Sequence, residues 1–354
     1  MKAFYYYMKA FYGITGLCLL LTANLIAQDK GKAADNAIDS KQFFLDENLF
    51  TAKLVTDMSA VSKKGKEEYI KAMFSCKLPD SSEVTEQIRV HARGIMRRSY
   101  CYIPPLKLNF HNPTSPRLYP LGGLKLTVGC KINSYFDQLL LKEYLVYKIY
   151  NLITDKSLRA RLVRLTIEDE KNKKKTYNQY AFFTEDIGAM AKRNNCKELT
   201  NAKLSTEATN RAQMTLVAVF QYMIGNTDWG VSVNHNIRLI RSKEDSTSSP
   251  FVVAYDFDYA GVVNAEYAVP DEKLETTTVL ERVYRGFPRT MGELDIALKI
   301  FKDQKENIYS LIKKFDLLTS RNRDEMIGYL DDFYKQINDR KTVQDVFIDN
   351  ARMH

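Results

Sequence analysis

The sequence predicts an α+β fold with two lobes, a β-rich lobe over residues 43–185 and an α-rich lobe over residues 186–354. Two observations carry this prediction. Up to about residue 184, apolar residues mostly alternate with polar ones, which is typical of strands with one buried face. After residue 186, apolar residues recur every three or four positions, which is typical of helices. A cleft between the lobes would be the default ligand site.

In the first half, three alternating segments follow turn residues and are predicted to be strands: 87–91, 106–110 and 124–128. One helix is expected after Asp137, whose side chain can cap it, because Leu141, Leu145 and Ile149 recur at helical spacing. Two further strands, 162–168 and 177–184, flank the lysine-rich segment 171–175, which predicts a hairpin.

In the second half, a buried helix is predicted to end at Gly225, a residue suited to a helix C-terminus. Strands 237–240 and 251–255 follow and are expected to pair as a hairpin. The rest of the chain is predicted to be mostly helical, with apolar stripes over residues 296–315 and 326–333.

The N-terminus has the pattern of a secretory signal peptide over residues 1–27. Lys2 and Lys9 precede an apolar run, and small residues end at Ala27. The run is shorter than the roughly 20 residues that span a bilayer. We therefore expect export to the periplasm or the cell surface, a polar linker over residues 28–42, and no transmembrane segment after cleavage.

Charge and cysteine content limit the classes of ligand. The net charge is +9, but much of it is local, as in Lys171–Lys175, and no motif predicts nucleic-acid binding. The mature chain has four cysteines and no C-x-x-C pair, so a zinc site is not expected. Cys101 and Cys130 flank strand-like segments; they either form a disulfide or are small buried apolar residues.

Three oxygen-bearing side chains stand at the ends of predicted elements. Asp228 follows the buried helix, Asn236 precedes a strand, and Asp256 ends the next strand. If the two strands form a hairpin, its open end brings Asn236 and Asp256 together, within reach of Asp228. Phosphoryl transfer uses such groups: one carboxylate accepts the proton of the attacking hydroxyl, and an amide and a carboxylate bind Mg²⁺. Asn234 is an alternative ligand, and ordinary loop chemistry is an alternative reading of the whole set.

These motifs resemble those of the CotH spore-coat kinases and, more distantly, the HipA kinases. The matching segments are Asn226-Thr227-Asp228, His235-Asn236 and Tyr255-Asp256-Phe257-Asp258, and upstream Val90–Gly94, Pro105–Phe110 and Tyr180–Glu185, over roughly residues 88–261. The whole chain also resembles a group of secreted Bacteroidota proteins that share Ala191–Asn194, Gly225–Trp229 and Tyr284–Phe287. The first resemblance implies a two-lobed atypical protein-kinase-like fold.

The resemblance also implies roles for individual residues. Asp228 would be the catalytic base, Asn236 and Asp256 would bind Mg²⁺, and Asp258 would be a further carboxylate there. Glu185 would lie by the hinge that meets the adenine. Lys125 would contact phosphate and pair with Glu143, with Lys107 as the rival lysine. Arg93 would contact phosphate or link strands, and His235 and Trp229 are expected to be structural.

The resulting functional hypothesis is an exported kinase that uses ATP and Mg²⁺ to phosphorylate a hydroxyl of a protein or glycan. Two alternatives remain: an inactive kinase-fold envelope protein that acts as a binding or assembly module, and a metal-dependent hydrolase. The chain departs from the CotH pattern in two places. Gly122-Gly123 is a poor substitute for a glycine-rich phosphate loop, and Ile95-Met96-Arg97 stands where that pattern has Asn and Ser after Arg-Gly.

Overall fold

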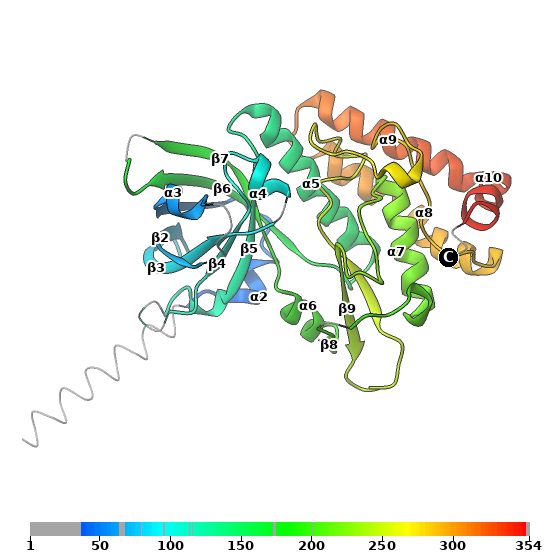
Figure 1. Cartoon of the computed structure of the whole chain (residues 1–354), viewed down its shortest axis with the longest axis horizontal. Coiled ribbons are helices and arrows are strands. Elements are labelled where there is room, and N and C mark those ends of the chain that lie inside the picture. The colour runs from blue at the N-terminus through cyan, green and yellow to red at the C-terminus, as the bar shows by residue number, and fades with distance from the viewer. Residues whose placement is uncertain are drawn as a thin grey trace, which may run out of the picture.

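The computed structural model describes residues 37–351 apart from residues 64–67, 79, 95, 113, 115, 173, 174 and 201. The predicted signal peptide and most of the predicted linker lie outside the described residues. A β-barrel forms one end of the molecule and a group of helices forms the other, with helix α5 between them (Figure 1).

Seven strands close into the barrel in the order β1-β2-β3-β4-β5-β7-β6. Their bounds are β1 Phe50–Thr56, β2 Ile70–Lys77, β3 Glu83–Ala92, β4 Leu106–Asn109, β5 Gly123–Val128, β6 Ala160–Asp169 and β7 Thr176–Thr184. Neighbours are antiparallel except β1 and β6, which run parallel from Phe50 opposite Val163 to Thr56 opposite Asp169. Buried and exposed residues alternate along β3, so its apolar side chains fill the barrel interior, as the period of a strand requires.

The expected two-lobed atypical protein-kinase-like fold is wrong: the chain is α+β, but its strands form a closed barrel. The parallel pairing of β1 with β6 closes it. Strand β1 was not expected, because charged residues such as Lys53 interrupt its short apolar runs. In addition, the helix expected within the β-rich lobe, α5 (Ser134–Ile153), packs in the same hydrophobic cluster as the C-terminal helices.

The predicted hairpin of β6 and β7 is confirmed, with Ala160 opposite Thr184 and Glu168 opposite Thr176. Helix α5 begins three residues before Asp137. Its N-cap is Asn133, whose side chain accepts a hydrogen bond from the Phe136 N–H. Asp137 instead accepts a hydrogen bond from the Tyr180 N–H at 3.1 Å, which connects the helix to β7.

The helical part contains a small second sheet with strand order β10-β9-β8. Its strands are β8 Cys196–Glu198, β9 Ile237–Ser242 and β10 Phe251–Ala254. The α-helices other than α5 are α2 Ser40–Phe43, α3 Met58–Val61, α4 Met96–Tyr100, α6 Ile187–Arg193, α7 Arg211–Ile224, α8 Met291–Lys313, α9 Ser320–Asn338 and α10 Arg340–Gln344. None of the described helices combines the length and apolarity needed to cross a membrane.

Candidate functional site

Helix α7 and the β9–β10 hairpin bring Asp228, Asn236 and Asp256 together. Helix α7 ends at Gly225, and strand β9 pairs with β10 so that Ile237 lies opposite Ala254. Beyond this pair the Tyr255 N–H donates to the Asn236 carbonyl oxygen at 3.1 Å. The Asn236 Nδ2 donates to Asp228, to its carbonyl oxygen at 2.8 Å and to its Oδ2 at 2.9 Å. The predicted hairpin and the predicted proximity of Asn236 to Asp228 are therefore confirmed.

The backbone at these residues has an uncommon conformation. Asn234, Asn236 and Asp256 have φ angles of 52°, 51° and 65°. Asn and Asp tolerate this left-handed region better than other non-glycine residues, because their short polar side chains can hydrogen-bond locally. Such conformations concentrate at functional sites, where the surrounding structure holds them. Here the hairpin pairing and the Asn236–Asp228 hydrogen bonds hold Asn236.

The side chain of Asp228 is 35% exposed, whereas Asp258 is buried. The Asp228 N–H donates to the Asn226 side chain at 3.0 Å, and buried Asn226 in turn donates to Gln221 at 3.0 Å. Its Oδ1 lies 2.6 Å from His235 Nε2. His235, expected to be structural, therefore contacts the candidate base directly.

A cavity of about 620 Å³ lies beside Asp228. It is lined by Ser205, Thr206, Thr227, Asp228, Trp229, Gly230, Val231, Ser232, Val233, His235, Tyr259, Val269, Asp271, Val279, Arg285 and Phe287. A molecule bound there would lie beside the Asp228 carboxylate. Trp229 is 5% exposed and packs in the core, in agreement with its expected structural role.

Asp256 and Asp258 follow β10, next to Glu143 on α5. The Asp256 N–H donates to the Tyr147 hydroxyl at 2.9 Å, while its carboxylate makes no hydrogen bond with any other described residue. Asp258 is 5% exposed, and burial together with the charge of Asp256 raises the pKa of Asp258 to about 7. Burial also raises the pKa of Glu143 well above its ordinary value, against the opposing effect of Arg97.

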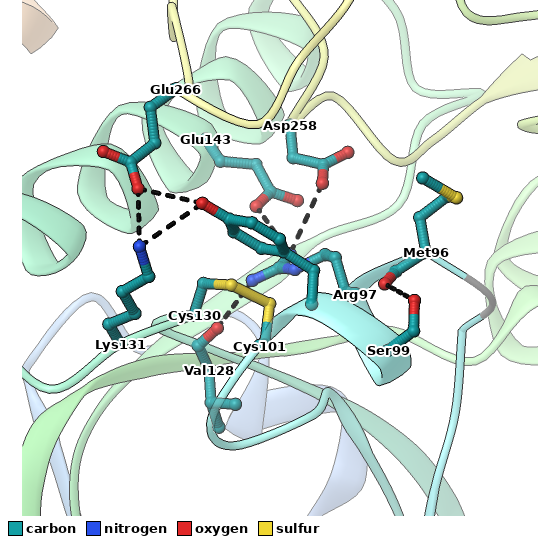
Figure 2. The surroundings of a disulfide bond; sticks show 11 residues. Met96, Arg97, Ser99, Cys101, Val128, Cys130, Lys131, Glu143, Asp258 and Glu266 are labelled. Atoms are coloured by element: carbon teal, nitrogen blue, oxygen red, sulfur yellow. Dashed lines mark hydrogen bonds and ion pairs between the residues drawn. A yellow bond between two sulfur atoms is a disulfide. The ribbon is translucent and has the colours of Figure 1, made fainter. Parts of the chain in front are cut away.

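Arg97, on helix α4, was not predicted as a site residue. Its Nη1 lies 3.5 Å from Glu143 Oε2 and 3.8 Å from Asp258 Oδ2, and its Nη2 donates to the Val128 carbonyl at 2.6 Å (Figure 2). Arg97 thus occupies the position beside Glu143 that was expected for Lys125. The only sequence signal was the departure at Ile95-Met96-Arg97 from the CotH pattern.

Lys125, Arg93 and Arg238 form a cationic cluster near Asp256. Lys125 Nζ lies 4.7 Å above the ring of Tyr255, and the Arg238 guanidinium lies 4.8 Å from the same ring. Burial, with the charges of Arg93 and Arg238, lowers the pKa of Lys125 to about 8. Arg93 donates to Thr127 at 3.0 Å, but its buried Nε makes no hydrogen bond with the part of the chain that the structure describes. Clustered cations with unused donors are suited to a polyanion such as phosphate.

Lys107, the rival lysine, lies directly opposite Lys125 on the neighbouring strands β4 and β5.

Glu185 lies at the end of β7, between the barrel and α6, and is buried. Its carboxylate pairs with Arg193, at 3.0 Å from Nε, and accepts a hydrogen bond from the Arg159 N–H at 3.1 Å. The Glu185 N–H donates to the Arg159 carbonyl at 2.9 Å. The side chain and the N–H group of Glu185 therefore both have hydrogen-bond partners within the fold.

The donor chemistry around Asp256 fits a hard cation. Its carboxylate is free of hydrogen bonds to described residues. Because Asn236 donates its Nδ2 to Asp228, the amide oxygen Oδ1 remains available as a ligand. Mg²⁺ prefers few protein oxygen ligands and keeps several waters. Within the described part of the chain, no three His, Cys, Asp or Glu side chains form a group that could hold a metal ion.

In comparisons with known proteins, no family model and no curated protein matches this chain. The resemblance to the CotH and HipA kinases therefore stays a prediction.

Proposed function

We propose that this protein transfers a phosphoryl group from ATP to a hydroxyl of a protein or glycan, with Mg²⁺ bound at Asp256 and Asn236. The single observation that carries the proposal is the position of Asp256. Its carboxylate, which makes no hydrogen bond with the described residues, lies near the Lys125 cluster and close to Asn236, which donates to Asp228. In this proposal the Lys125 cluster would bind phosphate, Asp256 and Asn236 would bind the cation, Asp228 would be the base, and the cavity beside Asp228 would receive the acceptor.

In the proposed reaction, the acceptor oxygen attacks the terminal phosphorus of ATP and the bond from that phosphorus to the ADP oxygen breaks. Asp228 orients the hydroxyl and accepts its proton at the carboxylate. Asn236 and His235 fix the direction of that carboxylate. Lys125 and Arg93 bind phosphate oxygens, and bound Mg²⁺ would neutralise charge that develops on them.

Calorimetry with Mg-ATP tests the binding step on the full chain. We expect wild type to bind, and Asp256→Asn to bind at least about tenfold more weakly, because a cation ligand loses its charge. Asp303→Asn is the matched control, since Asp303 lies on the exposed face of α8, and it should bind as wild type does. The absence of Mg-ATP binding by wild type, or equal binding by Asp256→Asn, would refute the proposed site.

Transfer from γ-labelled ATP to casein or to dextran tests the chemical step. The Asp228→Asn variant should bind ATP within about twofold of wild type and transfer about a hundredfold more slowly, the usual range for removing a general base. A label on casein alone would indicate a protein acceptor, and one on dextran alone a glycan acceptor. Equal transfer by wild type and Asp228→Asn would exclude Asp228 as the base.

The binding-module alternative keeps one specific observation in its favour. Glu143 lies beside Arg97 rather than Lys125, so the lysine–glutamate pair of the resemblance is absent among the described residues. Such a module would bind ATP but transfer no label to casein, dextran or water. Its ATP binding would also be unchanged by Asp228→Asn and by Asp256→Asn.

A further inference from the structure

Arg97 projects from α4, a five-residue helix in the connection between β3 and β4, into a group of buried carboxylates. Its side chain is 11% exposed, and those of Glu143 and Asp258 are 3% and 7% exposed. A buried carboxylate without a nearby cation is costly, so an arginine shared by two of them stabilises both. Glu143 is on α5 and Asp258 is on the segment after β10. Arg97, from the β3–β4 connection of the barrel, contacts both.

A disulfide holds the short helix that carries Arg97. Cys101, the residue that follows α4, is bonded to Cys130 in the connection between β5 and α5. The Cys101 N–H donates to the Arg97 carbonyl at 2.9 Å, and the Tyr102 N–H donates to the Cys130 carbonyl at 2.8 Å. Figure 2 draws the disulfide together with Arg97, whose Nη2 donates to the Val128 carbonyl two residues before Cys130. The helix is therefore bound to the β5–α5 connection by a covalent bond and by the main chain.

A second set of contacts joins the same two connections to the segment after β10. Glu266 accepts hydrogen bonds from the Tyr100 hydroxyl at 3.0 Å and from Lys131 Nζ at 2.8 Å. The rings of Tyr100 and Tyr267 lie 5.7 Å apart. The Lys131–Glu266 pair is exposed, and exposed pairs contribute little. The buried Arg97 interactions should therefore hold this segment more firmly.

We propose that Arg97 is a positioning residue that holds the Asp256–Asp258 segment against α5, and that the Cys101–Cys130 disulfide holds Arg97 in place. The consequence for catalysis rests on the proposed function, since Asp256 is the cation ligand in that reaction. Dithiothreitol would reduce the disulfide to two thiols and become a cyclic disulfide itself. The freed α4 would then withdraw Arg97, and residues 256–267 would lose their anchor. The geometry of the site thus depends on the thiol state of the chain.

Hydrogen exchange of the full chain, followed by mass spectrometry without ATP or metal, tests this inference. In Arg97→Gln, amides of residues 256–267 should exchange at least about tenfold faster, because a charge-assisted contact is lost. Reduction of wild type should have the same effect. Arg98→Gln is the matched control on the same helix, because the Arg98 guanidinium donates to the Lys63 carbonyl. Cys101→Ser/Cys130→Ser should resemble reduced wild type and should not respond to dithiothreitol.

Protection of β7 in each sample shows whether the barrel is intact, so that a local effect is separated from unfolding. Arg97→Lys provides a milder variant and should give an intermediate rate, because lysine keeps the charge without the planar fork. Unchanged exchange of residues 256–267 in Arg97→Gln, or in reduced wild type, would overturn the inference. The readout involves no nucleotide, so these results stand whether or not the protein binds ATP.

Discussion

Asn236 donates its side-chain amide to both the carbonyl oxygen and the Oδ2 of Asp228, at 2.8 and 2.9 Å. One side chain therefore fixes both the loop after α7 and the direction of the candidate base. It does so from a backbone conformation with φ of 51°, which only glycine adopts freely. Asn236 thus combines stabilising hydrogen bonds with a strained backbone. Substitutions can separate the two contributions to the free energy of unfolding.

The Asn236→Ala variant should lose about 2–4 kcal/mol of unfolding free energy in urea, from two hydrogen bonds and a left-handed alanine. Asn236→Gly should lose about 1 kcal/mol less, because it relieves the backbone strain. Asn264→Ala is the matched control: Asn264 is exposed, has φ of 54° and makes no side-chain hydrogen bond with described residues. It should lose only about 1–2 kcal/mol. Equal losses in Asn236→Ala and Asn264→Ala would mean that the hydrogen bonds to Asp228 contribute nothing.

Gly225 is required by both its conformation and its surroundings. Its φ is 68°, and a Cβ added there would overlap the Tyr329 hydroxyl. Gly225→Ala should therefore destabilise the protein by about 3 kcal/mol. Gly328→Ala is the control, since Gly328 lies within α9 with open space around it, and it should gain up to about 1 kcal/mol. Thermal melting of both variants checks this; a neutral Gly225→Ala would contradict the packing described here.

The stability of the metal-free protein should depend on pH through Asp258. Its pKa is about 7 in the folded chain against an ordinary 3.8, so the folded state binds this proton more tightly. The stability that Asp258 contributes is therefore full below about pH 4 and is lost as the pH rises through 7, at up to about 1.4 kcal/mol per pH unit. Urea titrations in EDTA should show this loss in wild type and a flatter curve in Asp258→Asn. Parallel curves would contradict the raised pKa.

ATP binding should weaken as the pH rises through about 8, where Lys125 loses its proton. Lys125→Arg should remove this dependence, because arginine stays charged. Lys125→Gln should bind about tenfold more weakly at pH 6.5, for loss of a charge-assisted contact to phosphate. Lys107→Gln, measured by the same calorimetry, tests whether Lys107 rather than Lys125 contacts phosphate. A larger loss in Lys107→Gln than in Lys125→Gln would transfer the phosphate contact to Lys107.

The sequence predicted the parts of the site that depend on neighbours along the chain. The end of α7 at Gly225, the β9–β10 hairpin and the meeting of Asn236 with Asp228 all follow from short-range patterns. Arg97 could not be found in this way. It lies 46 residues before Glu143 and 161 before Asp258, and nothing in its local pattern distinguishes it from Arg98.

The disulfide shows the same division. The sequence left Cys101 and Cys130 as either a bonded pair or buried apolar residues, and the structure joins them. Their separation of 29 residues carries no information about distance in space. The pairing is decided by where the β3–β4 and β5–α5 connections meet, which depends on the whole barrel.

By itself, the amino-acid sequence determined the α+β class, the β6–β7 and β9–β10 hairpins, and the candidate residues, because alternation, helix periodicity and turn residues act over a few positions. Only the tertiary structure decided that the strands close into a barrel, since β1 and β6 pair across more than a hundred residues. It also decided which cation lies beside Glu143. The path of the chain after β3 makes that choice, because it brings Arg97 on α4 against Glu143 and Asp258, and that path is a property of the folded chain.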